Sequence, residues 1–311
     1  MRVTANTFPN SLIDQLNRLA TRQYRLQNQA ATGQRITTPD DDPVAMRRVL
    51  DMQGEASSVG QYLRNVARNQ ELASASFAPI RAVGKVVDRA SEIAVLADGL
   101  KSPTELKAYA AEVDQLIGQA LELVNSRNRG DSLFGGTRAD VAPFSKVTDA
   151  EGKVVGVTYH GNTTLAENEI ASGVNLTAQT LGANTTGTGP RGLITDSRTG
   201  ADLFNHLISL RDNLLAGDVA AIASVDRPAL EADSDSVVYH LGTNASVQAR
   251  LETSQSLLKQ RSQSLEGLIS KEADADLAQT LVRLNEVQTA YQAALQSGGT
   301  ILGRSLMDYI R

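Results

Sequence analysis

The residue types that most often carry catalysis or bind metals are few in this chain, and they lie far apart. The 311 residues contain no cysteine and only three histidines, His160, His206 and His240. Without thiols, disulfide frameworks, Cys-ligated zinc, iron–sulfur clusters and thiol nucleophiles are excluded. No histidine has a second one at the i,i+4 spacing of a metalloprotease helix, so we interpret all three as isolated surface or edge residues.

Two short motifs could in principle hold a ligand. The carboxylates of Asp40–Asp42 could bind a cation, but the alternating ligands and closing glutamate of a calcium loop are missing. Acids directly before a proline, here Pro43, are typical of a helix N-cap and first turn. Residues 187–192 match G-x-G-x-x-G, yet no strand and helix flank them and Pro190 removes a backbone donor, so we interpret them as a loop.

No constellation of residues points to catalysis. Serine, histidine and aspartate all occur, but no G-x-S-x-G elbow singles out a nucleophile. We therefore predict no catalytic residue, no cofactor and no metal, and expect that the chain is not an enzyme. An activity hidden in the central segment remains a less favoured alternative.

Charge and hydropathy exclude two classes of partner. The chain carries 30 Lys and Arg against 35 Asp and Glu, a net charge of −5, and lacks the basic excess of nucleic-acid binders. No run approaches 18 consecutive apolar residues, and the N-terminus has no apolar core of a secretory signal. We expect neither a nucleic-acid nor a membrane partner.

The strongest pattern in the sequence is an apolar heptad repeat. From Val49 to Ala94, mostly apolar residues recur in alternating steps of three and four, which predicts a long helix with one narrow buried seam. Pro79 predicts a kink or a break within it. Ser102 begins a capping box for a second helix, and the short link between the two favours an antiparallel hairpin.

The pattern changes in the middle of the chain. Short alternating runs, such as Val155, Val157 and Tyr159, predict a small β-rich outer domain over residues 139–196. Helical spacing returns afterwards. The predicted fold class is therefore mainly α: an elongated antiparallel long-helix bundle with a small β-rich inserted domain. Its helical rod domain comprises residues 39–138 and 197–273.

The two ends of the chain look like partners. Residues 1–36 carry five arginines against one aspartate, and residues 272–311 carry five acids against three arginines. A lone helix with so narrow an apolar stripe is marginal in water, so we predict that residues 1–38 and 274–311 are a terminal helical pair, disordered in the monomer and ordered by other copies. The predicted subunit-interface residues are Leu12, Leu16, Leu19, Leu26, Leu277, Leu281, Leu284, Tyr291 and Leu295.

Four stretches, by their order and places, resemble the bacterial flagellin family. They are the opening MRVTANTFPNSL, residues 33–45 with Asp41, Asp42 and Pro43, the element Leu133-Phe134-Gly135-Gly136-Thr137, and the closing SLMDY. The resemblance covers about residues 1–140 and 200–311. Within the family it is strongest to junction subunits between hook and filament, since flagellins more often continue the double aspartate with small residues and no proline.

The resemblance implies a structural role on the outside of the cell. Copies of the chain would form a ring between the first hook-associated junction protein and the flagellin filament. The family also implies export through the flagellar type III apparatus without a cleaved signal, and an export chaperone at the C-terminal helix. Two alternatives stay open: filament flagellin itself, and a cytoplasmic coiled-coil scaffold.

Overall fold

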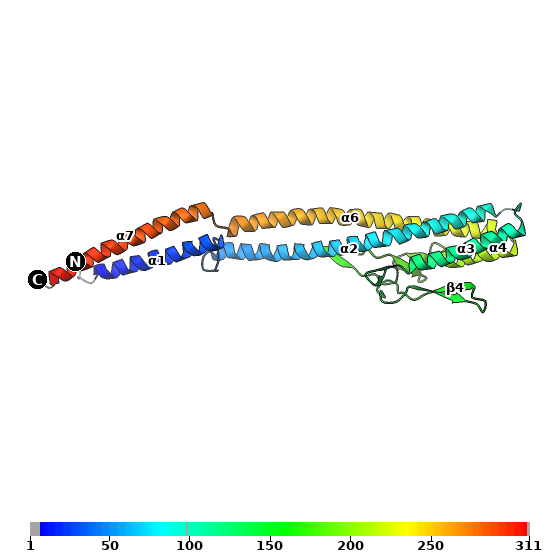
Figure 1. Cartoon of the computed structure of the whole chain (residues 1–311), viewed down its shortest axis with the longest axis horizontal. Coiled ribbons are helices and arrows are strands. Elements are labelled where there is room, and N and C mark those ends of the chain that lie inside the picture. The colour runs from blue at the N-terminus through cyan, green and yellow to red at the C-terminus, as the bar shows by residue number, and fades with distance from the viewer. Residues whose placement is uncertain (1–6, 98, 310–311) are drawn as a thin grey trace. The chain divides into compact units, whose positions relative to one another are not determined.

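The computed structural model of the chain describes residues 7–97 and 99–309 (Figure 1). It is mainly α, with long helices and a small β-rich region, which confirms the predicted fold class. The helices are α1 (Thr7–Thr32), α2 (Pro43–Leu96), α3 (Pro103–Val124), α4 (Leu203–Ala216), the single turn α5 (Val219–Ala221), the π-turn η1 (Ile222–Asp226), α6 (Arg227–Ala273) and α7 (Leu277–Tyr309).

The chain divides into two compact units, to which α2 and α6 both contribute. One unit comprises residues 1–59 and 260–311, and the other comprises residues 60–259. In the second unit α2 and α6 run antiparallel, because Arg227 at the start of α6 donates from Nε to the carbonyl of Ala94 near the end of α2, at 3.0 Å. Further along, Asn244 donates from Nδ2 to the carbonyl of Ala73, also at 3.0 Å.

The heptad seam of α2 is buried as predicted. Six residues exactly seven apart lie at 5% exposure or less: Val59, Val66, Ala73, Ile80, Val87 and Ala94. Of the kink or break predicted at Pro79, the break does not occur, because α2 continues through Pro79 to Leu96. A proline inside a helix loses one backbone hydrogen bond, and the fully buried neighbours Ile80 and Val83 supply packing that offsets this loss.

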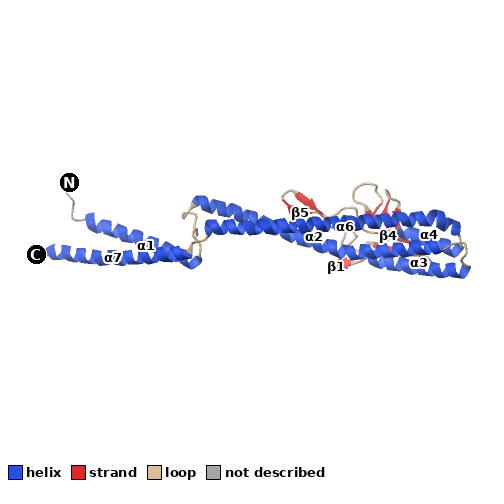
Figure 2. Cartoon of the chain, turned by 90° about the horizontal axis from the view of Figure 1, so that it is seen from above, coloured by secondary structure: helices blue, strands red, loops and turns tan. Residues whose placement is uncertain are grey.

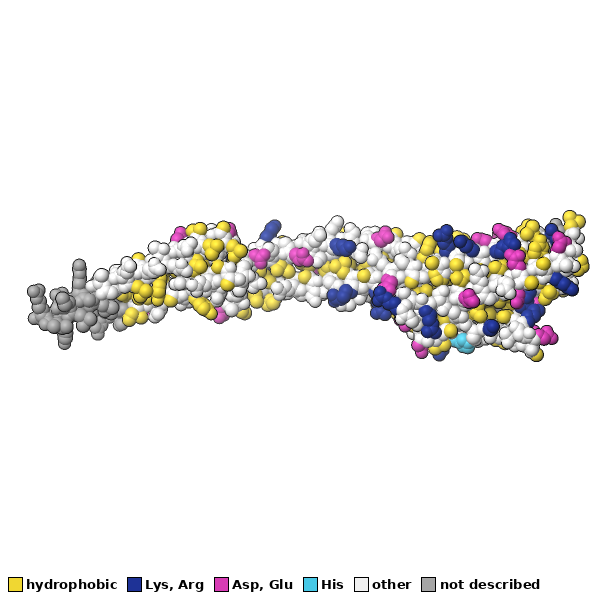
Figure 3. Space-filling view, viewed as in Figure 1, with side chains coloured by type: hydrophobic (Ala, Val, Ile, Leu, Met, Phe, Trp, Pro, Cys, Tyr) yellow, Lys and Arg dark blue, Asp and Glu magenta, His cyan; other side chains and the backbone are white. Residues whose placement is uncertain are grey.

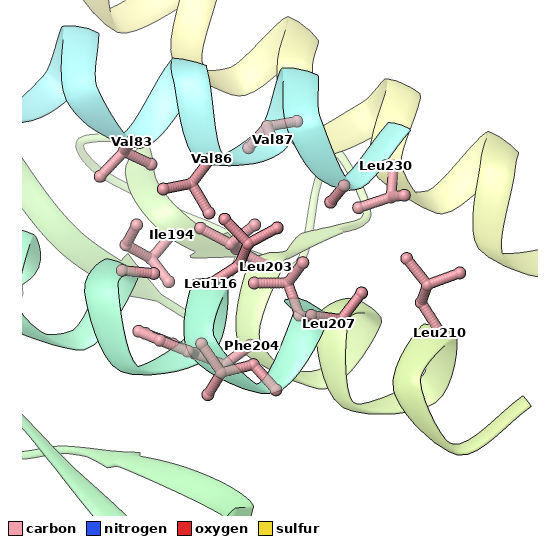
Figure 4. Packing of buried hydrophobic residues seen from close by; sticks show 14 of the residues in the cluster. Val83, Val86, Val87, Leu116, Ile194, Leu203, Phe204, Leu207, Leu210 and Leu230 are labelled. Carbon is pink, nitrogen blue, oxygen red and sulfur yellow. The ribbon is translucent and has the colours of Figure 1, made fainter. Parts of the chain in front are cut away.

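The main core of the second unit lies among α2, α3, α4 and α6. Figure 4 shows Val83, Val86 and Val87 of α2 facing side chains from α3 and α4, with Leu230 of α6 beside them. The capping box of α3 is present as predicted: Ser102 and Glu105 each accept from the other's backbone N–H. Helix α4 ends at Gly217, whose φ of 71° is the left-handed conformation that favours glycine.

The strands form small sheets beside the helices of the second unit (Figure 2). β7 and β8 pair in parallel, β8 and β9 pair antiparallel, and the remaining strands form three antiparallel hairpins. Their bounds are β1 (Arg127–Asn128), β2 (Asp131–Ser132), β3 (Phe144–Thr148), β4 (Val154–Tyr159), β5 (Asn168–Ala171), β6 (Val174–Leu176), β7 (Leu181–Asn184), β8 (Gly192–Asp196) and β9 (Ala201–Asp202).

These strands share their core with the helices. Phe144 of β3, Ala183 of β7 and Ile194 of β8 belong to the same buried cluster as the seams of α2, α3 and α4. Arg211 of α4, 2% exposed, also reaches β4, since its Nη1 donates to the carbonyl of Val154 at 2.7 Å. The strand segment is therefore tied to the helices by both apolar and polar contacts.

Candidate subunit interface

The terminal helices α1 and α7 pack against each other within the first unit. On α1 the covered face is the predicted stripe, in which Leu26 is buried and Leu12, Leu16 and Leu19 are half-buried. The 4-3 spacing of these leucines places them on one side of the helix. Four of the predicted interface residues are thus engaged by the chain's own partner helix.

On α7 the predicted stripe is divided between covered and exposed residues. Leu284 and Tyr291 are half-buried, and they lie on the same side as the buried Val287. By contrast, Leu277, Leu281 and Leu295 are 47%, 51% and 48% exposed. Helix α1 therefore covers only part of the apolar surface of α7.

Helix α1 carries a second apolar stripe, which was not among the predicted interface residues. Ile13 is 54% exposed and Tyr24 is 68% exposed, and the exposed Ala20 and Ala31 follow them at steps of seven. These four residues lie roughly 100° around the helix from the leucine stripe. Their regular spacing was visible in the sequence but was masked by the stronger leucine repeat.

The two linkers that lead to α1 and α7 are hydrogen-bonded to each other. The backbone N–H of Arg35 donates to the carbonyl of Ala273 at 2.6 Å, and the N–H of Ala275 donates to the carbonyl of Gly33 at 2.8 Å. Gly33 has a φ of 72°, which lets the chain turn directly after α1. We call this pairing of residues 33–35 with residues 273–275 the linker joint.

Charged side chains reinforce the linker joint. Arg35 donates from Nη2 to the carbonyl of Glu272 at 2.7 Å, and its Nη1 lies 3.5 Å from Oδ2 of Asp42. The Glu272 carboxylate also accepts from Nη2 of Arg48 on α2, at 3.1 Å. Because charge-assisted hydrogen bonds are stronger than neutral ones, Arg35 holds together segments that are 237 residues apart.

The motif aspartates have separate structural roles. Asp41 accepts through Oδ2 from the backbone N–H and the hydroxyl of both Thr37 and Thr38, and Arg25 lies 3.2 Å from its Oδ1. These hydrogen bonds, above all that from the Thr37 backbone, lower the pKa of Asp41. Asp42 caps α2 by accepting from the N–H of Ala45 at 3.0 Å, as expected for an acid before Pro43.

The Leu133–Thr137 element forms a turn in the second unit. Its Phe134 carbonyl accepts from the N–H of Gly182 at 2.9 Å and from the hydroxyl of Tyr159 at 3.0 Å. Gly136 has a φ of 67°, and the next residue, Thr137, donates its N–H to Oδ1 of Asn162 at 3.0 Å. Hydrogen bonds to Gly182 of β7 and Tyr159 of β4 therefore hold the motif against the strands.

The histidine prediction is partly wrong. His240 is buried rather than at the surface, and burial lowers its pKa. His206 lies 2.8 Å from Oδ2 of the buried Asp233. His160 is exposed and pairs with Ser145. The described residues contain no group of three or more His, Cys, Asp or Glu arranged to hold a metal.

Residues 187–191 of the glycine-rich motif are a loop, as predicted. The prediction that no strand flanks the motif is wrong, because β7 precedes it and its last residue, Gly192, begins β8. Asn184 donates to the carbonyls of Thr188 and Pro190, and Arg198 donates to those of Gly189 and Pro190. These bonds shape the loop from within its own segment. Among the described residues, no helix is long and apolar enough to cross a bilayer.

Comparison with known proteins agrees with the motifs found in the sequence. Residues 3–139 match the family model described as the bacterial flagellin N-terminal helical region, so the chain resembles the bacterial flagellin family, as its motifs predicted. Within that family its resemblance is to flagellar hook-associated protein 3.

The similarities to individual proteins are distant. The chain is 24% identical to flagellar hook-associated protein 3 of Salmonella typhimurium over 60% of this chain and 51% of the relative. It is 28% identical to that of Escherichia coli K12 over 41% of this chain and 40% of the relative. The matches thus span about half the length of these relatives or less. The crystal structure of Xanthomonas campestris FlgL has 17% identity and a TM-score of 0.58, covering 70% of this chain and 99% of that one.

Proposed function

We propose that this chain is a structural subunit of the bacterial flagellum that forms the junction between hook and filament. The observation that carries the proposal is the α1–α7 pair with its linker joint, in a chain similar to hook-associated protein 3. Copies of the chain form a ring, with the first hook-associated junction protein on one side and flagellin on the other. The role is structural and involves no catalysis.

Assembly proceeds through the terminal helices. Residues 1–38 and 274–311 are disordered in the free chain and become ordered on neighbouring copies, while residues 39–138 with 197–273 form the rod and residues 139–196 the outer domain. The exposed leucines of α7 support this, because apolar side chains gathered on one helix face mark an interaction site. A pair of helices with such narrow apolar stripes has only marginal stability in water without further contacts.

The chain reaches the flagellum by type III export, without a cleaved signal peptide. An unfolded chain exposes its apolar stripes, so an export chaperone binds the C-terminal helix until the chain leaves the cell. The absence of cysteine fits this route, since no disulfide can form before or during export.

Immunogold labelling of intact cells tests the proposal. A strain that expresses the chain with an epitope tag in the exposed loop of residues 185–190 should show one gold band at the base of each filament. Labelling along the whole filament would assign the chain as flagellin instead. Absence of flagellar label, with the chain retained in the cytoplasm, would favour a coiled-coil scaffold.

A further inference from the structure

We propose that this chain binds a small organic monocarboxylate in a cavity between α6 and the strand segment, with Arg191 as the residue that holds the carboxylate. The cavity has a volume of about 230 Å³ and lies wholly within the second unit. Helix α6 lines one side of it with residues between Tyr239 and Val247, and residues between Leu165 and Arg191 line the other. The inference goes beyond the proposed function and does not depend on it.

The cavity combines buried lining residues with an exposed rim. Ala178, Leu181 and His240 line it and are buried. Tyr239 and Arg191 also line it, but both are exposed. Sites for small molecules typically have a mostly apolar wall and a few placed polar groups. The cavity therefore offers room for the apolar body of a small molecule and a cation at its rim.

An aromatic ring holds Arg191 in place at the rim. The guanidinium carbon of Arg191 lies 4.3 Å from the centre of the Tyr239 ring, which is a cation–π contact. An arginine that is stacked on a ring keeps the N–H donors at the edge of its plane available, and these donors match the two oxygens of a carboxylate. The cation is therefore oriented before a ligand arrives.

The guanidinium of Arg191 forms no ion pair with any acid in the described part of the chain. The carboxylate of Asp196 is engaged elsewhere: Nη2 of Arg198 lies 2.7 Å from its Oδ2, and the N–H of Gly192 donates to the same oxygen at 2.9 Å. Asp235 lines a neighbouring hollow that Arg191 also lines, but the two side chains do not pair. Arg191 is therefore available to an anion from outside the chain.

The buried His240 adds a polar group to the cavity without adding charge. Burial lowers the pKa of His240, so its ring is neutral at neutral pH. Its Nε2 atom is buried and has no hydrogen-bond partner among the described residues. An unpaired buried polar atom is costly, and a neutral ring that carries its hydrogen on Nε2 can donate to an oxygen. A carboxylate ligand supplies the acceptor that this atom lacks.

The surroundings favour a ligand with one charge and an apolar body. On the face of the second unit that Figure 3 shows, acidic and basic side chains are mixed. A polyanion would therefore meet charges of both signs. The cavity has the volume of about eight water molecules at roughly 30 Å³ each, which suits an aliphatic acid of about six carbons.

Binding of hexanoate to the purified full-length chain tests the proposal. Isothermal titration calorimetry and saturation-transfer NMR should detect binding in the millimolar range, as expected for so small a ligand. Hexanamide has the same body without the charge and should bind at least about tenfold more weakly, because it loses the charge-assisted pair with Arg191. Acetate should also bind at least about tenfold more weakly, because it lacks the apolar body.

Two variants with matched controls locate the site. Arg191→Met keeps an apolar stem and should bind hexanoate no more tightly than hexanamide, whereas Arg81→Met, at an exposed position of α2, should bind like the wild type. Thr243→Phe changes an exposed residue that lines the cavity, so the new ring should fill the cavity and abolish binding. Ala245→Phe lies on the opposite side of α6 and should leave binding unchanged.

Circular dichroism of each variant checks that it is folded. Equal affinity of the wild type for hexanoate and hexanamide, or no hexanoate binding by the wild type, would overturn the proposal. A folded Arg191→Met chain that still prefers hexanoate would overturn the role of Arg191. Unchanged binding by folded Thr243→Phe would overturn the assignment of the site to this cavity.

Discussion

Leu12 of α1 and Gly298 of α7 are in direct contact: a Cβ atom on Gly298 would lie 2.5 Å from Cδ2 of Leu12. The neighbouring Gly299 has nothing within 4 Å of the same position. The missing side chain of Gly298 therefore allows the two helices to approach each other, whereas Gly299 does not take part in this contact. This relationship separates a glycine needed for packing from one that is merely tolerated.

Replacing Gly298 by valine should weaken the α1–α7 pair. Overpacking of this kind costs about 1–3 kcal/mol, so the amount of chain recovered in purified flagella should fall at least about fivefold. Gly299→Val is the matched control, with the same change in helix propensity but no contact to Leu12. Equal recovery of the two variants on immunoblots would contradict the role of Gly298.

A charge on the exposed face of α7 should abolish assembly while leaving the free chain folded. Leu281→Asp places a carboxylate in a contact that is dry in the assembly, at a cost of several kcal/mol. Leu16→Asp should do the same by separating α1 from α7. Circular dichroism of each purified variant should match the wild type, and Thr289→Asp on another face of α7 should still assemble. A large loss of helix in the free Leu281→Asp chain would refute this.

Removing the guanidinium of Arg35 should open the linker joint. Arg35→Met loses the hydrogen bonds to the Glu272 carbonyl and its attraction to Asp42, worth about 1–3 kcal/mol together. Hydrogen exchange of the N–H groups of Arg35 and Ala275 in purified flagella should speed up by roughly tenfold or more. Arg47→Met, an exposed arginine of α2, serves as the control, and equal rates in both variants would count against the joint.

The α1–α2 linker should lose order in acid. Hydrogen bonds led by the Thr37 backbone lower the pKa of Asp41 from 3.8. Because the pKa of Asp41 is lower in the folded chain than in the unfolded chain, its ionised form stabilises the fold at pH values above the unfolded pKa, near 4. This stabilisation is lost as the pH falls through the lower pKa of the folded chain. Solid-state carboxyl NMR of purified flagella, in which residues 1–38 are ordered, should find the Asp41 pKa below 3.8. The pKa should lie closer to 3.8 in Thr37→Val, which removes a hydroxyl donor. An unchanged pKa in that variant would show that the hydroxyl does not contribute.

The Leu133–Thr137 turn should not tolerate alanine at its second glycine. Gly136 has a φ of 67°, and a Cβ there would collide with Oδ1 of Asn162. We expect Gly136→Ala to lower the free energy of unfolding by about 2–4 kcal/mol in urea titrations. Gly118→Ala in α3, where nothing lies within 4 Å, should instead raise it by about 0.5–1 kcal/mol.

Local sequence patterns predicted most of the helical architecture. The heptad seam of α2, the capping box at Ser102 and the Asp42 cap all appear as expected. Each of these features depends on residues within about one or two helical turns of one another, so its spacing can be recognised in the sequence. The break expected at Pro79 failed because buried neighbours on both sides outweigh one lost hydrogen bond.

The sequence by itself determined which residues are apolar, how they repeat and which family the motifs resemble. Only the tertiary structure decided which of the two apolar stripes on α1 faces α7. It also showed that Leu277, Leu281 and Leu295 of α7 remain exposed. It brought Arg35 into a hydrogen bond with Glu272, 237 residues away. The reason is physical. Periodicity specifies the faces of a single helix, but the choice among faces depends on the shape and charge of a partner distant in sequence.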